Sequence, residues 1–270
     1  MSATPKRQPA LFIPHGGGPC FFMDWTWGPA DTWHATRRFL ESIAASLPEA
    51  PRAILVVSGH WEEPAFTASA AAQPALIFDY SGFPADTYQL TWPAPGSPHL
   101  AAQAAQLLRH AGLPSATSPT RGFDHGVFVP LKVAFPGADV PVVPLSLVSS
   151  LDPALHLAAG RALAPLRDEG VLIIASGMSF HNLGAYFHPE TRDRARAFDA
   201  WLTAAAQSHA LERAAILTRW RQAPSAAFAH PREEHLAPLF VAAGAASDAP
   251  GTRIFTGEPM GAAISAYRFD

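Results

Sequence analysis

Histidine is the residue type that gives this chain most of its chemical potential. The sequence holds twelve histidines and one cysteine, Cys20. A lone cysteine excludes an internal disulfide and any zinc site built from several thiolates, so a metal would have to be held by histidine, aspartate or glutamate. Because imidazole both titrates near neutral pH and binds divalent metals, the histidines are candidates for metal ligation and for proton transfer.

Three histidines follow short apolar runs directly. His15 comes after "ALFIP", His60 after "AILVVSG", and His181 ends the run "VLIIASGMSF". Continuous apolar runs of this length predict strands that are buried on both faces. Ligands of open α/β sheets bind beyond the carboxyl ends of the strands, so we expect these three imidazoles to meet there.

The other histidines carry weaker signals. His125 lies beside Asp124 in "RGFDHGVFVPL", and His235 follows Glu234 at the start of the predicted helix "EEHLAPLF". For both, a core or surface position is an open alternative to a functional one. Five more fall on mixed faces of predicted helices and are expected to face solvent: His34, His99, His110, His156 and His209. Two lie in loops beside prolines, where a functional role is not favoured: His188 and His230.

The glycines after His15, in "PHGGGPC", suit three kinds of site. A lipase-type oxyanion hole requires a G-x-S-x-G elbow, and the nearest candidate, "GMSFH" at 177–181, has histidine where a small residue is needed. A phosphate loop requires a Lys-Ser/Thr pair or a dinucleotide fingerprint, and the segment has neither. A metal site remains, in which the glycines would give substrate and oxygen clearance beside His15.

The elements that must position these residues are strands that alternate with helices. Four apolar runs predict strands at 10–16, 53–61, 140–147 and 171–181. Helical patterns at 31–47, 97–112, 152–170, 190–210 and 232–246 separate or follow them. The first three begin with a capping residue, namely Asp31, Ser97 and Asp152, and Pro165 should break the last turn of the third.

This alternation predicts the fold class. We expect one α/β domain over residues 1–270, with a largely parallel or mixed central sheet flanked by helices and a metal site at the carboxyl ends of the strands. The segment 70–98 is rich in proline, glycine and aromatic residues and has no clear period. A long loop of this kind in a compact domain is usually functional.

Composition narrows the partners. Hydrophobic residues make up 49% and charged residues 15% of the chain, which is typical of a globular protein, and the formal net charge is −3. That balance gives no reason to expect nucleic acid or an anionic membrane as a partner. No apolar run approaches the roughly 20 residues of a membrane span, and "MSATPKRQPA" lacks the apolar region of a secretory signal, so we expect a cytoplasmic protein.

Taken as a set, the motifs resemble one known family. The chain is similar to the class III extradiol ring-cleaving dioxygenases, in the branch that resembles 4,5-DOPA dioxygenase. The resemblance spans residues 11 to about 245 and rests on these segments: "LFIPHGGGP", "ILVVSGHWEE", "FDYSGFPADTYQLTWPAPGSPHLA", "GFDHGVFVPL", "IIASGMSFHNL" and "EEHLAPLFVAAGA".

This resemblance implies a metal-dependent enzyme. It implies one divalent metal per chain, with Fe(II) expected for activity and Zn(II) as the alternative in the isolated protein. The expected substrates are a small aromatic diol of the catechol type, DOPA or a relative, and O2. A homo-oligomer is a further expectation, and no nucleic-acid or membrane partner is expected.

The resemblance also implies roles for individual residues. His15, His60, His181 and His235 are similar to the family's metal-site histidines. Glu234 is the alternative to His235, because a related branch uses two histidines and a glutamate. His125 resembles a substrate-facing acid/base or a hydrogen-bond donor to oxygen, and His181 resembles either a ligand or a catalytic base.

Two other functions fit part of the same evidence. The first is a non-catalytic, Memo-like binding protein on the same fold, because a framework of strands that end in histidine specifies a pocket but not turnover. The second is a zinc-dependent hydrolase that activates water at the metal and works without oxygen.

Overall fold

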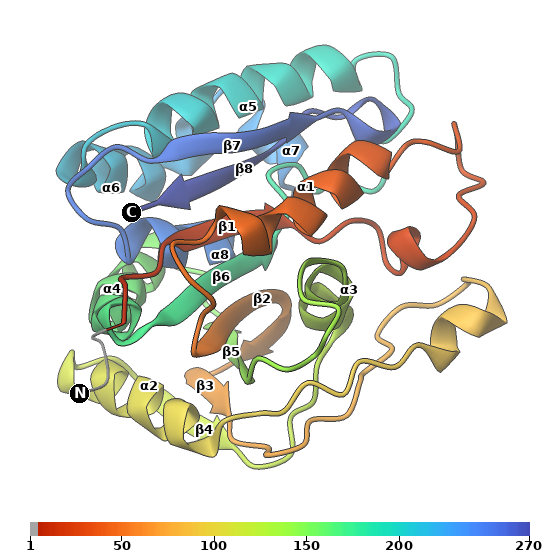
Figure 1. Ribbon diagram of the computed structural model, residues 1–270. Coiled ribbons are helices and arrows are strands. Elements are labelled where there is room, and N and C mark those ends of the chain that lie inside the picture. Colours follow the sequence, from red (N-terminus) through yellow and green to blue (C-terminus); the bar gives the residue numbers. More distant parts are fainter. Residues whose placement is uncertain (1–4) are drawn as a thin grey trace.

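An eight-stranded mixed sheet forms the centre of the molecule (Figure 1). The structure is a computed structural model that describes residues 5–270. Across the sheet the strands follow the order β4-β3-β5-β2-β6-β1-β8-β7. Their bounds are β1 Ala10–Pro14, β2 Ala53–Glu63, β3 Phe66–Ser69, β4 Ser115–Ser118, β5 Val142–Val148, β6 Val171–Gly177, β7 Thr252–Gly257 and β8 Ile264–Phe269.

The four strands expected from apolar runs form the parallel centre of this sheet. β2 pairs with β5 and β6, and β6 pairs with β1, all in parallel register. Every residue of β1, β5 and β6 is buried, as continuous apolar runs predict for strands covered on both faces. The expectation of an α/β domain with a largely parallel or mixed sheet is therefore confirmed.

The outer strands carry no comparable run. β3 and β4 have four residues each, and β4 contains no buried residue. On the other side, β8 pairs antiparallel with β1 and β7, which makes the sheet mixed. β3 and β4 are short, and β4 and β7 are partly exposed, so these strands lack the long buried pattern that marks the centre.

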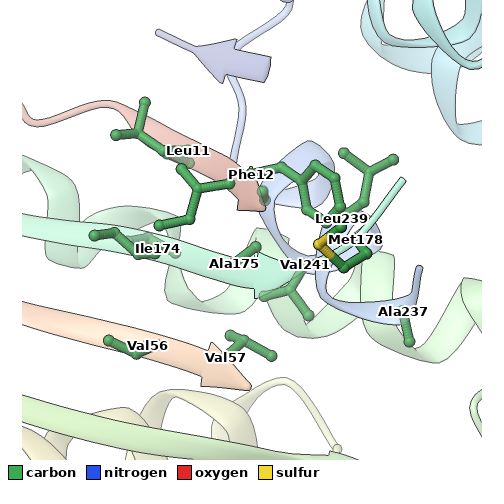
Figure 2. Packing of buried hydrophobic residues seen from close by; sticks show 14 of the residues in the cluster. Leu11, Phe12, Val56, Val57, Ile174, Ala175, Met178, Ala237, Leu239 and Val241 are labelled. Carbon is green, nitrogen blue, oxygen red and sulfur yellow. The ribbon is translucent and has the colours of Figure 1, made fainter. Parts of the chain in front are cut away.

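Helices cover the sheet on both sides. They are α1 His34–Ser46, α2 Pro98–His110, α3 His125–Ala134, α4 Pro153–Leu163, α5 Thr191–Ala206, α6 Ala210–Thr218, α7 Ala226–Ala229 and α8 Ala237–Gly244. α8 contacts β1, β2, β6 and α4, whereas α1 and α3 contact each other. Figure 2 shows Leu239 and Val241 of α8 among the fully buried side chains of these three strands.

Two of the three predicted helix starts are confirmed. Ser97 accepts a hydrogen bond from the backbone N–H of Leu100, and Asp152 accepts one from that of Ala154. Pro165 ends α4 as expected, since the chain continues as a 3-10 helix, Ala164–Glu169. The prediction for Asp31 is wrong: α1 begins at His34, and the Asp31 carbonyl accepts the His34 N–H within a preceding turn.

One prediction about an exposed histidine is also wrong. His156 is fully buried in α4, where its Nδ1–H donates to the Asp152 carbonyl and its Nε2 accepts the backbone N–H of Val148. It lies inside because α4 packs against α8, so this face of the helix turns towards the interior. Over residues 5–270, no helix has the length and apolar character needed to cross a membrane.

Candidate metal centre

Three imidazoles direct their Nε2 atoms at one point beside the carboxyl ends of the central strands. The Nε2 atom of His60 lies 3.3 Å from that of His15 and 3.1 Å from that of His235. Ligand atoms of these three residues all lie within 4.8 Å of one another. Two nitrogens bound to one ion at 2.0–2.1 Å in tetrahedral or octahedral geometry are about 2.9–3.4 Å apart, so the observed separations fit a shared ion.

Each of the three histidines comes from a different element. His15 directly follows β1, and its backbone N–H donates to the Gly177 carbonyl at the end of β6. His60 lies in β2, where the pairing with β5 shifts register between Val57 and Glu62. Such an irregularity re-aims side chains at the end of a strand. His235 lies in the turn before α8, and its carbonyl accepts the N–H of Met178.

Hydrogen bonds on the opposite ring nitrogen leave the Nε2 atoms of His15 and His235 as acceptors. The Nδ1–H of His15 donates to the Gly16 carbonyl at 2.8 Å, and that of His235 donates to the Glu234 carboxylate at 2.8 Å. A second partner of this type fixes the tautomer of a metal-binding histidine. Acceptor nitrogens that face one another at about 3 Å repel unless a cation or a proton lies between them. The donor set therefore fits a divalent metal.

Burial keeps these imidazoles neutral. Desolvation, followed by the neighbouring histidines, lowers the pKa of both His15 and His235 well below the ordinary value. For His60, burial and then His125 lower the pKa to about 3, although Asp79 acts in the opposite direction. Neutral imidazole is the form that binds metal, so the site needs no deprotonation near pH 7.

Glu234 orients two histidines at once. Its Oε1 atom accepts hydrogen bonds from the Nδ1–H of His181 at 3.0 Å and from that of His235. The ring of His181 stacks on the ring of His235, with centroids 3.4 Å apart. Burial raises the pKa of the Glu234 carboxyl, but the bond from His181 and the other favourable contacts outweigh it, and the net pKa is lowered. The Glu234 carboxylate is thus ionised. It lies on the Nδ1 side of the His181 and His235 rings, opposite their Nε2 atoms.

Asp79 plays a similar part for His125. Its Oδ1 atom accepts both the backbone N–H and the Nδ1–H of His125, each at 2.9 Å. Burial alone would raise the pKa of the Asp79 carboxyl. The hydrogen bonds and electrostatic interaction with His125 outweigh burial, and the net pKa is lowered. His125 is the first residue of α3, and its ring centroid lies 3.9 Å from that of His60. The fixed Nδ1–H leaves the Nε2 of His125 free.

A cavity of about 480 Å³ opens beside these five histidines. All five line it, together with the glycines that follow His15 and a set of aromatic and apolar side chains. The volume falls within the range of about 300–1,000 Å³ that is usual for small-molecule sites. Aromatic residues in the lining are Trp25, Trp27, Trp33, Tyr80, Phe83, Tyr186 and Phe187.

All three glycines after His15 line the cavity, and local packing requires two of them to be glycine. A Cβ atom on Gly16 would lie 2.5 Å from the Cys20 sulfur, and one on Gly18 would lie 2.7 Å from the Phe83 ring. Both residues also have positive φ, 87° and 53°. Gly16 and Gly18 therefore make room for neighbouring side chains and adopt a left-handed backbone, which few other residues do. The clearance for substrate and oxygen stays a prediction. Cys20 is a buried, packed thiol, and burial raises its pKa.

The structure brings all of the sequence-predicted site residues into one region, in three groups that share members. His15, His60 and His235 share the convergent point, whereas His181 groups with Glu234 and His235. His125 groups with His60 and with Asp79, a residue that the sequence analysis did not single out. Asp79, Tyr80 and Phe83 belong to the long segment 70–98. That segment was expected to be functional, but its loop sequence has no periodicity that could indicate which side chains point inward.

The same sequence matches one family model over almost its entire length. The model is described as the catalytic LigB subunit of aromatic ring-opening dioxygenase, and it matches residues 9–269. The match includes every histidine at the cavity.

Several characterised proteins and a solved structure are similar. The chain is 40% identical to 4,5-DOPA dioxygenase extradiol of Beta vulgaris, over 92% of this chain and 90% of that protein. It is 38% identical to dioxygenase tasH of Hapsidospora irregularis, over 96% of this chain and 84% of the other. The crystal structure of an uncharacterized protein from Escherichia coli K12 superposes with a TM-score of 0.79, at 30% identity, over 98% of this chain and 100% of its own.

Proposed function

The chain belongs to the family of catalytic LigB subunits of aromatic ring-opening dioxygenases, and we propose that His15, His60 and His235 bind the metal of its reaction. It is a metal-dependent extradiol dioxygenase, an oxidoreductase that opens the ring of a catechol-type substrate with O2. The observation that carries the ligand assignment is the convergence of three Nε2 atoms, with that of His60 3.3 Å from that of His15 and 3.1 Å from that of His235.

We propose Fe(II) as the active metal and Zn(II) as an ion that the same nitrogens can hold. Three protein ligands leave positions for other molecules, which is the arrangement of non-haem Fe(II) oxygenases. A metal bound there would supply a common attachment point for the two catechol oxygens and for dioxygen, and so bring the reactants together. Glu234, offered as the alternative ligand, is better suited to hold the His181 and His235 rings by their Nδ1–H groups.

Two histidines that line the cavity remain for proton transfer. With its Nδ1–H donated to Glu234, His181 has its Nε2 available to accept a proton from a catechol hydroxyl. With Nδ1–H donated to Asp79, His125 presents its own Nε2 to the cavity, where it can take up a proton and return it to a developing oxygen anion. The ring centroids of His125 and His60 are 3.9 Å apart, so this transfer would take place beside a metal held by His60.

The alternatives receive no support from the family or the relatives. A non-catalytic, Memo-like binding protein would need the pocket but not a pair of free imidazoles held by Asp79 and Glu234. A zinc-dependent hydrolase would need no dioxygen. The relatives whose names state an activity are dioxygenases.

Reconstitution tests the proposed function. Protein stripped of metal is loaded with Fe(II) or Zn(II) without oxygen, mixed with catechol substrates, and then exposed to O2 while the ring-opened product is followed by absorbance. We expect product only with Fe(II) and O2 together. Zn(II)-loaded protein that hydrolysed an ester or amide without oxygen, with no ring opening in the Fe(II) arm, would favour the hydrolase instead. An iron-loaded protein that opens no catechol would contradict the proposal. Cytoplasmic location and a homo-oligomer stay predictions from the sequence.

A further inference from the structure

The cavity carries no fixed charge that could bind a charged substituent. Among residues 5–270, its polar lining consists of the five histidines, Tyr80, Tyr186 and Ser81, and it includes no lysine, arginine, aspartate or glutamate. The nearest carboxylates, Asp79 and Glu234, are turned towards histidine nitrogens and add negative charge behind the site. A substrate carboxylate that lay along this cavity, away from the metal, would lose its water and gain no cationic side chain as a partner, which is costly.

The arginines that could have served are engaged elsewhere. Arg121 pairs with Asp124 at 2.7 Å, and Arg232 pairs with Glu62 at 2.6 Å. Arg192 lines a neighbouring surface hollow. Three acidic residues line the same hollow, namely Asp31, Asp193 and Glu258. None of these three arginines contributes to the cavity lining.

A continuous aromatic wall leads from the histidines to the surface. The ring centroids of His125 and Tyr80 are 5.8 Å apart, and those of Tyr80 and Phe83 are 5.5 Å apart. The centroids of Phe83 and Trp27 are 5.2 Å apart. Trp27 in turn lies 5.1 Å from Trp25, which contacts Trp33. All of these rings line the cavity. Successive rings at these separations form one apolar surface along which a planar substrate and its substituent can lie.

The mouth of the cavity is apolar as well. In the part of the chain that the structure describes, four large hydrophobic residues are exposed, and three of them line this cavity: Trp27 at 48%, Leu183 at 73% and Phe187 at 62%. The two sides of the mouth approach each other at Gly28 and Phe187. A Cβ atom built on Gly28 would lie 3.7 Å from the Phe187 ring, which is van der Waals contact. Exposed apolar residues concentrated around one opening indicate a binding site, whereas single exposed apolar residues are common and indicate none.

We propose that the substrate of this enzyme is a catechol with an uncharged, apolar substituent, which lies along the aromatic wall and contacts Trp27, Leu183 and Phe187 at the mouth. This inference rests on the proposed function, and it narrows the substrate from catechols in general to neutral alkyl- or aryl-substituted ones. The cavity of about 480 Å³ holds both the ring and such a substituent.

Three catechols of matched shape test the proposal on the Fe(II)-loaded enzyme. 4-Propylcatechol, 3-(3,4-dihydroxyphenyl)propionate and the methyl ester of that acid share the ring and the first two chain carbons, and only the acid is charged. We expect kcat/KM to be at least ten-fold higher for the propyl compound and the ester than for the acid, chiefly through KM. Turnover of the acid as efficient as that of 4-propylcatechol would overturn the inference and leave the proposed function intact. An enzyme that opens none of the three would contradict the proposed function, and the inference would fall with it.

A charge added at the mouth provides the matched control. Leu183→Arg places a cation beside the opening, and Leu211→Arg makes the same change at a residue that is 90% exposed and outside the cavity lining. We expect Leu183→Arg to lower the preference for 4-propylcatechol over the acid at least three-fold, and Leu211→Arg to leave that ratio unchanged. Equal ratios in the two variants would contradict a substrate that passes Leu183.

Discussion

His60 and His235 hold their Nε2 atoms 3.1 Å apart, although 175 positions separate them in the chain. Both rings are held by the sheet: His60 lies in β2, and the His235 carbonyl is bonded to Met178 just beyond β6. The contact is thus a property of the folded scaffold and does not depend on local sequence. Two ring nitrogens so close together need a cation or a proton between them.

Loss of the His60 imidazole should abolish metal binding. In His60→Ala, the central nitrogen of the three is removed, and the remaining two offer too few ligands for tight binding. We expect less than a tenth of the wild-type metal content after reconstitution and dialysis, measured by elemental analysis. His34→Ala, which changes an exposed histidine at the start of α1, should load fully. A His60 variant with full metal content would remove this residue from the ligand set.

His125→Ala should separate metal binding from turnover. The His125 ring bonds to Asp79 through Nδ1 and lies outside the convergent group, so the metal content should remain near one ion per chain. Loss of a proton-transfer group should lower kcat by about 10²–10⁴-fold. Elemental analysis and oxygen consumption on the same sample check both parts. Equal loss of metal in His125→Ala and His60→Ala would show that the two roles are assigned wrongly.

Glu234→Gln should weaken metal binding without removing a ligand. The carboxylate fixes the Nδ1–H groups of His181 and His235, and replacing such a partner costs about 10–100-fold in metal affinity. Competition with a chelator gives the affinity directly. Glu233→Gln is the matched control, because that neighbour pairs with Arg221 instead. If Glu234→Gln bound no metal at all, the carboxylate itself would be the ligand.

His230 should make the free energy of unfolding depend on pH. Burial lowers its pKa to about 3, and its Nε2–H donates to the Ser179 carbonyl. The unfolded chain takes up this proton below about pH 6.5 and the folded chain does not, so stability is complete above that pH and falls as the pH drops towards 3. His230→Gln keeps a donor but cannot titrate, so denaturant unfolding should show a shallower decline, by about 1.6 kcal/mol between pH 6.5 and 5. The exposed substitution His34→Gln should leave the slope unchanged, and a His230→Gln slope equal to the wild-type slope would contradict the buried, neutral state.

Gly16→Ala should combine backbone strain with a steric clash. Gly16 and Gly112 both have positive φ, but a Cβ atom on Gly16 meets the Cys20 sulfur, whereas one on Gly112 meets nothing within 4 Å. We expect Gly112→Ala to cost about 1–2 kcal/mol for the left-handed conformation alone. Gly16→Ala should cost more, and it should also reduce metal content because His15 is adjacent. Equal destabilisation and full metal loading in both variants would contradict the packing role of Gly16.

The centre of the fold could be predicted because its signal is local. The apolar runs that became β1, β2, β5 and β6 carry their burial in consecutive residues, and the Ser97 and Asp152 caps are visible in sequence. Helix α3 was missed because it begins in a glycine-flanked loop, contains Pro130, and is buried on nearly every face, so no amphipathic pattern marks it.

The candidate site was predicted in its residue types but not in its groupings. The histidines that follow strands were expected to meet, and His15 and His60 do contact each other through Nε2. His235 contributes the third convergent nitrogen because of the turn before α8 and the hydrogen bond from the Met178 N–H to the His235 carbonyl. Both are tertiary features, which the local sequence does not reveal. The role of Asp79 depends on the path of the segment 70–98, which no periodicity reveals.

The long separations between the three convergent histidines also affect how the molecule holds together. An ion bound by nitrogens 45 and 175 positions apart would cross-link the chain, closing loops that the unfolded state leaves open. Ion concentration would then act on folding by mass action, adding about 4 kcal/mol when the free ion is 1,000 times its dissociation constant. Melting temperature thereby becomes a reporter of occupancy that requires neither substrate nor oxygen.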